Sequence, residues 1–174
     1  MRRLPRLRGP FAVALALAVL APALRLAAGP ARDHGLAGGG RTPRDTAILD
    51  DVATTEVLGD VSTALARVFS YAPDDLAATE RAAGTELSGR ALDEYRRLFA
   101  QVRRQAPAQR VTLATRVVRA GVVSLTGDTA RLLVFLDQTA TRAGGPDGTP
   151  AAAQLAVTAH RDRGHWTITA LTSV

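Results

Sequence analysis

Apolar residues recur along this chain in two different periods, and the first of them is helical. From Thr46 to Ser70 they return at spacings of three and four, which predicts one buried face of an amphipathic helix. Thr46 is of the type that caps helix N-termini, and Pro73 disfavours helical geometry at Ala72. We therefore expect a helix that ends near residue 70–72 and buries Ile48, Leu49, Val52, Val57, Leu58, Val61, Leu65, Val68 and Phe69.

Two more helices are predicted before the period changes. Asp74 is suited to cap a second, short helix over about 74–83, which we expect to end at Gly84. A third helix is expected from about Ser88 to Gln105, with Pro107 ending it. The residues predicted on its inner face are Leu92, Tyr95, Leu98, Phe99 and Val102.

After residue 107 the pattern becomes that of strands. Residues 111–118 and 122–125 are rich in β-branched side chains, and Ala120-Gly121 between them predicts a bulge or bend. A strand with an apolar centre follows over 131–138. Two further segments alternate between apolar and polar residues, and turn residues separate the strands. Those two segments are 154–160 and 166–170, and the expected turns or loops are 127–128, 144–150 and 162–164.

Three helices followed by about four antiparallel strands make an α+β fold with segregated elements. A strongly curved sheet wrapped around the helices covers both layers and leaves a cone-shaped interior beside the first helix. Such an interior could hold an apolar ligand. We assign residues 46–174 to one domain, and whether two copies pair through their sheets as a homodimer stays open.

An arginine-flanked apolar leader precedes this domain. Residues 9–24 are uncharged, a run of 16 that is shorter than the roughly 20 residues of a spanning helix. Two interpretations remain open for residues 1–28: a signal anchor in which Arg25 reaches the outer interface, or a signal peptide cleaved near Gly29 or Arg32. Both export the domain. Residues 29–45 are rich in glycine and predict a flexible linker. The arginines before the apolar run are Arg2, Arg3, Arg6 and Arg8.

The net charge of +6 belongs to this leader and not to the domain. Residues 1–45 hold eight Arg and two Asp, whereas residues 46–174 hold fourteen Arg and fourteen acids. Within the domain, residues 46–89 are acidic and residues 90–119 are basic. We expect either a solvated face that complements the acidic helices, or a docking face for an acidic partner or anionic lipid. Exported topology argues against nucleic acid. The arginines of the third helix are Arg90, Arg96, Arg97, Arg103 and Arg104.

Few residues suit catalysis or metal binding. General acid–base chemistry needs a titratable group in reach of substrate, and the candidates are Tyr71, Tyr95, Asp137 and His160. We interpret the tyrosines as core aromatics, Asp137 as a residue at a strand end and His160 as a residue of the polar sheet face. His160 and His165 flank a turn with Asp162 between them, a weak signal for a metal. The chain has no cysteine, so thiolate sites are excluded. We therefore expect no enzyme, cofactor or metal.

Several short segments, taken in this order, resemble one family. They are the leader, Phe69-Ser70-Tyr71, Asp74-Asp75-Leu76, Leu87-Ser88-Gly89 with Leu92 and Tyr95, Val117-Val118-Arg119-Ala120-Gly121-Val122-Val123, the run from Asp128 to Gln138, and Gly164-His165-Trp166. Together they resemble the actinobacterial Mce-associated membrane proteins over about residues 46–172.

The resemblance implies an NTF2-like (SnoaL-like) cone fold. It also implies a non-catalytic accessory subunit that stabilises or assists an Mce lipid-import system in the cell envelope, with Mce-family transporter proteins as partners. The membrane helix would pass once, with its N-terminus cytoplasmic and the domain outside; secretion after cleavage is the alternative. A pocket enzyme of the dehydratase or isomerase type, or a secreted protein that binds an apolar ligand, would be the other functions open to this fold.

Overall fold

A computed structural model describes residues 43–145 and 148–174. Three helices come first: α2 (Pro43–Val68), α3 (Leu76–Glu86) and α4 (Gly89–Gln109). Four strands follow: β1 (Val111–Thr126), β2 (Thr129–Arg142), β3 (Thr149–Asp162) and β4 (His165–Ser173). The predictions for the leader at 1–28 and for most of the linker fall outside the described residues.

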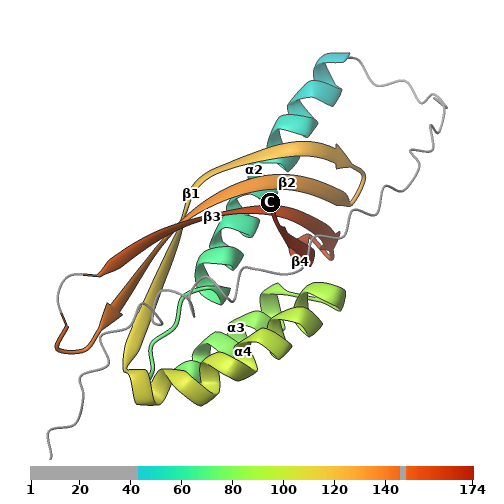
Figure 1. The fold of residues 1–174 in the computed structure, drawn as a ribbon. Coiled ribbons are helices and arrows are strands. Elements are labelled where there is room, and N and C mark those ends of the chain that lie inside the picture. Colours follow the sequence, from blue (N-terminus) through green and yellow to red (C-terminus); the bar gives the residue numbers. More distant parts are fainter. Residues whose placement is uncertain (1–42, 146–147) are drawn as a thin grey trace, which may run out of the picture.

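The strands form one antiparallel sheet in the order β1-β2-β3-β4, which is also their order in the sequence. Figure 1 shows the sheet arching over the helices, with α2 crossing beneath its concave face and α3 and α4 lying together below. The predicted architecture, α+β with three helices on a curved antiparallel sheet, is confirmed. None of the helices in the part of the chain described is both long and apolar enough to cross a bilayer.

The core lies between the concave face of the sheet and the three helices. The first helix contributes a stripe at helical spacing, as its periodicity predicts. The strands contribute alternate residues, which is the pattern of a sheet with one covered face. Among the core residues are Val57, Val61, Leu65, Val68, Tyr95, Phe99, Val102, Leu132, Val134, Leu136, Leu155, Val157, Trp166 and Ile168.

Several helix boundaries differ from the predictions. The first helix begins at Pro43 and not after Thr46, so it includes the end of the segment predicted as linker; a proline fits the first position of a helix because its N–H is not needed there. Gly84 does not end α3, which continues to Glu86 because Leu87 beyond it is buried and bridges to Ile168 of β4. Asp75, not Asp74, caps this helix: its carboxylate accepts a hydrogen bond from the Ala78 amide at 3.1 Å.

Pro107 does not end α4 either, because the helix continues to Gln109. Pro107 removes one intrahelical hydrogen bond because it has no N–H, and the helix continues for only two residues beyond it. The helix ends at Arg110, whose φ of 52° is left-handed and whose amide donates to the Ala106 carbonyl at 2.8 Å.

The first predicted pair of strands is one continuous strand, β1, and its irregularities lie elsewhere than predicted. Ala120 and Gly121 pair regularly with Val134 and Leu133 of β2. The register shifts instead between Val117 and Arg119, and again between Val122 and Ser124. Each shift is a β-bulge with one extra valine, since two residues on β1 then oppose one on β2.

Both predicted hairpin turns are present. Gly127 has a φ of 55° in the β1–β2 turn, and Arg163 and Gly164 have φ of 49° and 84° in the β3–β4 turn. Two successive left-handed residues fit the right-handed twist of the flanking strands. A backbone pair clamps the start of β1: the amides of Tyr71 and Leu113 each donate to the other's carbonyl at 2.9 Å.

Candidate functional site: the arginine face of α4

The most strongly charged helix surface of the domain is the outer side of α4. Its inner side is buried through Ala91, Tyr95, Phe99, Val102 and Ala106, at the spacing of a helix face that packs on a core. The polar residues between these positions therefore face solvent. We call the five arginines of this side the arginine face: Arg90, Arg96, Arg97, Arg103 and Arg104, all exposed.

Two of these arginines are paired with acids. Arg90 Nε lies 3.0 Å from Glu94 Oε1 one turn along α4. Arg103 Nη1 lies 3.4 Å from Glu80 Oε1 of α3, which joins the two helices. Exposed pairs of this kind stabilise a fold by about 0.2–1 kcal/mol. For these two arginines, the structure therefore agrees with the first interpretation, a solvated face whose charges are paired with acids of the same chain.

The other three arginines keep their charge uncompensated. Arg96, Arg97 and Arg104 form no ion pair with any residue of 51–145 or 148–174; the Nε of Arg97 donates only to the Asp93 carbonyl, at 3.2 Å. Arg96 and Arg103 also border a hollow of about 370 Å³ between α3 and α4. The sequence-predicted arginines thus lie on one helix, with three cationic groups available to an acidic partner.

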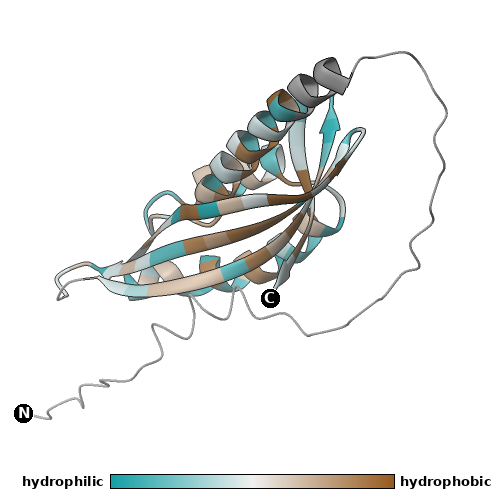
Figure 2. Cartoon of the chain, turned by 90° about the horizontal axis from the view of Figure 1, so that it is seen from above, coloured by the Kyte–Doolittle hydropathy of each residue, from teal (hydrophilic) through white to brown (hydrophobic). Residues whose placement is uncertain are grey.

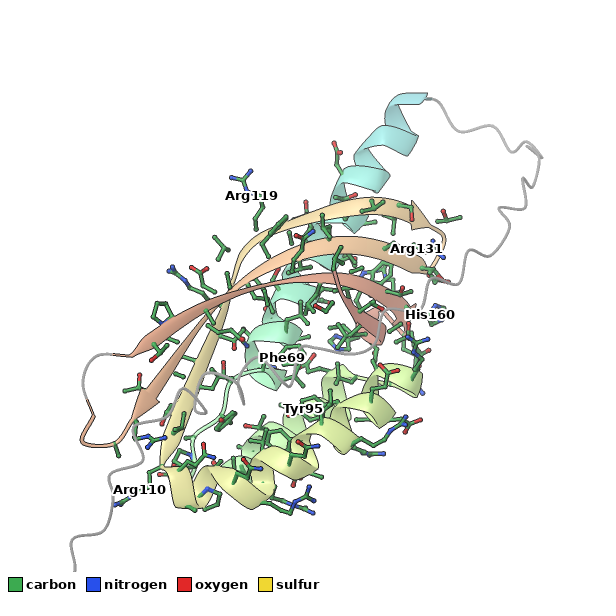
Figure 3. All side chains as sticks on the ribbon, in the orientation of Figure 1. Phe69, Tyr95, Arg110, Arg119, Arg131 and His160 are labelled. Carbon is green, nitrogen blue, oxygen red and sulfur yellow. The ribbon has the colours of Figure 1, made fainter. Side chains whose placement is uncertain are left out.

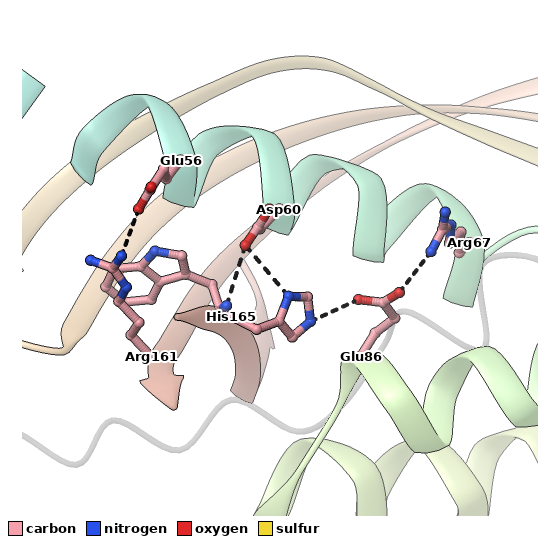
Figure 4. Close-up of polar contacts among 7 residues, drawn as sticks. Glu56, Asp60, Arg67, Glu86, Arg161 and His165 are labelled. Carbon is pink, nitrogen blue, oxygen red and sulfur yellow. Dashed lines mark hydrogen bonds and ion pairs between the residues drawn. The ribbon is translucent and has the colours of Figure 1, made fainter. Parts of the chain in front are cut away.

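Acidic side chains of α2 and of the C-terminal end of α3 contact the β3–β4 hairpin (Figure 4). Glu86 accepts a hydrogen bond from Arg67 Nη1 at 3.1 Å, and its side chain is only 6% exposed. The imidazole of His165 lies between Glu86 (3.7 Å) and Asp60 (3.6 Å). Arg161 pairs with Glu56 at 3.0 Å.

These contacts join α2, α3 and the β3–β4 hairpin, so this acidic cluster serves the fold. Sequence reasoning missed it because Asp60, Glu86 and His165 are far apart in the chain and no motif connects them.

The candidate acid–base residues are not brought together. Tyr95 is buried in the core and its Oη donates to the Val68 carbonyl at 3.1 Å. Burial raises the pKa of Tyr71, and burial together with the negative charge of Glu80 raises the pKa of Tyr95. Asp137 does not lie at a strand end as predicted: it lies inside β2, because this strand continues to Arg142, and Arg116 holds it at 2.8 Å on the outer sheet face. His160 is exposed on the sheet, 3.5 Å from Thr129 Oγ1.

The two histidines flanking the hairpin turn are also apart. His160 opposes Thr167 in the β3–β4 register, while His165 opposes Asp162 and reaches the helices. No cluster of three or more His, Asp or Glu able to hold a metal ion occurs within residues 43–145 and 148–174. The hairpin therefore brings no pair of imidazoles toward a common ion.

A groove of about 220 Å³ lies between α4, the middle of β3 and the end of β4. The cone interior was predicted beside the first helix, but there the buried side chains of α2 pack into the core. The lining of the groove is mostly apolar, with Glu94 and Arg97 the charged residues among those that border it. Because Tyr95 is already hydrogen-bonded to Val68, the groove offers an apolar surface and no free acid or base from that phenol. The apolar lining residues are Phe69, Ala91, Tyr95, Leu98, Leu155 and Leu171.

Comparison with known proteins gives distant sequence relatives and a shared fold. No protein-family model matches the sequence. The uncharacterized proteins MT1407 and Rv1362c of two Mycobacterium tuberculosis strains are each 33% identical over 126 residues, which is 72% of this chain. The chain spans 57% of the length of these two relatives.

Solved structures share the fold at low sequence identity. The periplasmic fragment of TraM superimposes with a TM-score of 0.57 at 11% identity, over 68% of this chain and 95% of that one. CagV, a VirB8 homologue of the Helicobacter pylori type IV secretion system, gives 0.57 at 12%, over 70% and 97%. The periplasmic domain of DotI gives 0.56 at 15%, over 78% and 99%. The chain therefore has the VirB8-like variant of the NTF2-like α+β fold.

Proposed function

We propose that this protein is a non-catalytic accessory subunit of an Mce-type lipid import system, an exported protein-binding module held at the outer side of the membrane by its leader. The observation that carries the proposal is the arginine face: Arg96, Arg97 and Arg104 are exposed and have no acid partner among residues 51–145 and 148–174. Cations arranged along one rigid helix favour a partner with acidic side chains. The partner we propose is an acidic surface of an Mce-family protein.

The solved structures of this fold support the envelope setting. The TraM and DotI domains are periplasmic, and CagV belongs to a secretion system. The order of the segments that resemble Mce-associated membrane proteins adds the Mce connection, which is the finer part of the proposal.

An apolar-ligand-binding function is the second candidate, and the groove between α4 and β4 favours it. An enzyme of the dehydratase or isomerase type has less support. The Tyr95 phenol at the groove is engaged with a backbone carbonyl, and Glu94 is engaged with Arg90. Neither group is poised to move a proton at a bound substrate.

The experiment that tests the proposal is affinity purification of the full chain from detergent-solubilised native membranes. We expect Mce-family proteins in the eluate, and we expect the triple variant R96E/R97E/R104E to lose them. A matched control replaces three exposed arginines outside α4, R81E/R142E/R163E, and should retain them. A folded wild-type chain that brings down no Mce protein contradicts the proposal.

The localisation is tested separately by N-terminal sequencing of the native protein. The signal-anchor interpretation predicts that the chain begins at Met1 or Arg2 and stays with membranes after a salt wash. A mature start near Gly29 or Arg32 would instead establish cleavage and a secreted domain.

A further inference from the structure

The two bulges of β1 turn apolar side chains toward solvent. Val117 opposes Leu136 and Arg119 opposes Phe135, so Val118 is the extra residue of the first bulge. In the second, Val122 opposes Leu132 and Ser124 opposes Arg131, so Val123 is the extra residue. A bulge places two successive side chains on one face of the sheet. Val118 is 56% exposed and Val123 is 72% exposed, which a regular alternation would not produce at both sites.

These valines belong to a larger apolar surface. Phe135, opposite the first bulge, is 39% exposed on the same outer face. The helices cover only the concave face, and Figure 2 looks onto the uncovered outer one. Val118, Val123 and Phe135 are three of the five large apolar residues exposed in the described part of the chain. We call these three residues the outer apolar patch. None of the five lies on α4, so the arginine face carries no exposed large apolar side chain.

Two free arginines accompany the patch. Arg119 faces Phe135 and Arg131 faces Ser124 in the β1–β2 register. Figure 3 shows Arg119 projecting away from the crest of the arch and Arg131 near the β1–β2 turn. Neither pairs with an acid in residues 51–145 or 148–174, whereas neighbouring Arg116 is held by Asp137. Apolar side chains between unpaired arginines match the chemistry of an anionic lipid surface, with an acyl boundary beneath a layer of phosphates.

The entry point of the chain lies on the same side. Figure 1 shows the N-terminal end of α2 beyond the sheet, on the side of the β1–β2 turn. Residues 1–42 join the domain at this end, and they include the apolar run that the sequence predicts as a membrane or signal helix. An anchored chain would therefore reach the domain beside the outer apolar patch and far from α4.

We propose that the outer apolar patch, flanked by Arg119 and Arg131, rests on the anionic phospholipid surface of the membrane. This rests on the anchored topology of the proposed function. The domain would lie with its sheet toward the bilayer and the arginine face of α4 directed away from it, toward a protein partner. A second copy fits the patch less well, because a two-fold contact would bring Arg119 and Arg131 close to the same charges of the other copy.

The absence of cysteine makes a direct test practical. The full chain carries a nitroxide at Val123→Cys, or in the control at Gln101→Cys on the exposed side of α4, and is placed in nanodiscs with or without phosphatidylglycerol. We expect the label at residue 123 to be accessible to oxygen and protected from a water-soluble nickel chelate in anionic discs. The label at residue 101 should stay open to the chelate in both lipids.

Charge variants then test the arginines. R119Q/R131Q should lower the ratio of docked to undocked protein by about fivefold for each arginine, the effect of one basic residue near an anionic surface. The matched control R103Q/R104Q removes the same charge from α4 and should leave the ratio unchanged. High salt should act like R119Q/R131Q.

Three results would overturn the proposal: a label at residue 123 that is open to the chelate in anionic discs, an equal loss in both charge variants, or protection that appears only when Mce proteins are added. The last would assign the patch to a protein. Because these discs contain no Mce protein, the outcome is independent of the co-purification that tests the accessory role.

Discussion

The phenol of Tyr95 on α4 closes the end of α2 by donating to the Val68 carbonyl at 3.1 Å. Val68 is the last residue of α2, where carbonyls lack an intrahelical donor. The same ring stacks on Phe99 with centroids 5.2 Å apart and meets Phe69 edge-on. One side chain thus joins the two longest helices through both a hydrogen bond and aromatic packing.

Removing that hydroxyl should destabilise the domain. We expect Tyr95→Phe to lower the free energy of unfolding by about 1–2 kcal/mol, because a buried carbonyl loses its donor. Urea unfolding followed by circular dichroism measures it. Tyr71→Phe is the matched control, since the Tyr71 hydroxyl has no hydrogen bond among the described residues, and it should change the value by less than about 0.5 kcal/mol. Equal losses would show that the Val68 contact contributes nothing specific.

Stability should also fall at alkaline pH. The raised pKa of Tyr95 means that the folded state keeps a proton that the unfolded state releases near its ordinary value of 10.0. The stabilisation is therefore complete below about pH 10 and is lost as pH rises through the folded value. The chain has no lysine or cysteine, so Tyr71, whose pKa burial also raises, is the other tyrosine that titrates in this window, and Tyr71→Phe gives its share of the decline. Phenolate absorbance and urea midpoints measure it, and Tyr95→Phe should flatten the decline.

The buried carboxylate of Glu86 should matter more than exposed ones. Glu86→Gln weakens the contact to Arg67 and removes the charge facing His165, so we expect a loss of about 1–2 kcal/mol in unfolding free energy. Glu94→Gln removes the exposed pair with Arg90 and should cost less than about 0.5 kcal/mol. Thermal unfolding of both variants provides the measurement. A smaller loss for Glu86→Gln than for Glu94→Gln would contradict the role given to the α2–α3–β4 contacts.

A buried hydrogen-bond network beneath β1 allows the cost of two substitutions, at Thr115 and at Gln138, to be compared. Thr115 Oγ1 donates to the Phe69 carbonyl at 2.7 Å and accepts from Gln138 Nε2 at 3.0 Å. Thr115→Val leaves both partners unpaired and should cost about 1–3 kcal/mol.

Gln138→Leu should cost less, within about 1 kcal/mol, because the Gln138 Oε1 atom is buried without a partner and its removal offsets the lost bond. The two single variants and the double variant, unfolded in urea, give the comparison. If Gln138→Leu is the more damaging change, an unseen partner must satisfy its oxygen.

The fold was largely predictable because its periods are clear. The three- and four-residue spacing of α2 and the alternation of Leu155, Val157 and Ala159 each predict one buried face, and both faces are buried in the core. Val52 was predicted on the same face of α2 but is 54% exposed, because the core begins only at Val57. The helix ends predicted from Pro107 and Gly84 were wrong. A residue with low helix propensity costs little free energy near the end of a helix, so tertiary packing decides where the helix ends. Gly121 likewise misplaced the bulge, although the doublets Val117-Val118 and Val122-Val123 break the alternation and mark the true positions.

The candidate site was only partly predictable. Periodicity places the arginines on the outer side of α4, but it cannot tell which of them find acids. Arg103 reaches Glu80 of α3, for example, while Arg104 has no such partner in residues 51–145 or 148–174. The outer apolar patch was missed for a related reason. Valines in a strand are expected inside, and only the paired register with β2 shows that Val118 and Val123 point outward.

The sequential order of the strands has a consequence for how the chain folds. Every strand pairs with its neighbour in sequence, so the sheet can grow by local zipping from its two tight turns. The long-range closure is the docking of α2, whose Asp60 accepts from the Trp166 amide across 106 residues. In a kinetic φ-value analysis, which compares the effect of a mutation on the folding rate with its effect on stability, we expect high values near Gly127 and Gly164 and low values along α2. Mutations in α2 should therefore speed unfolding and leave the folding rate almost unchanged.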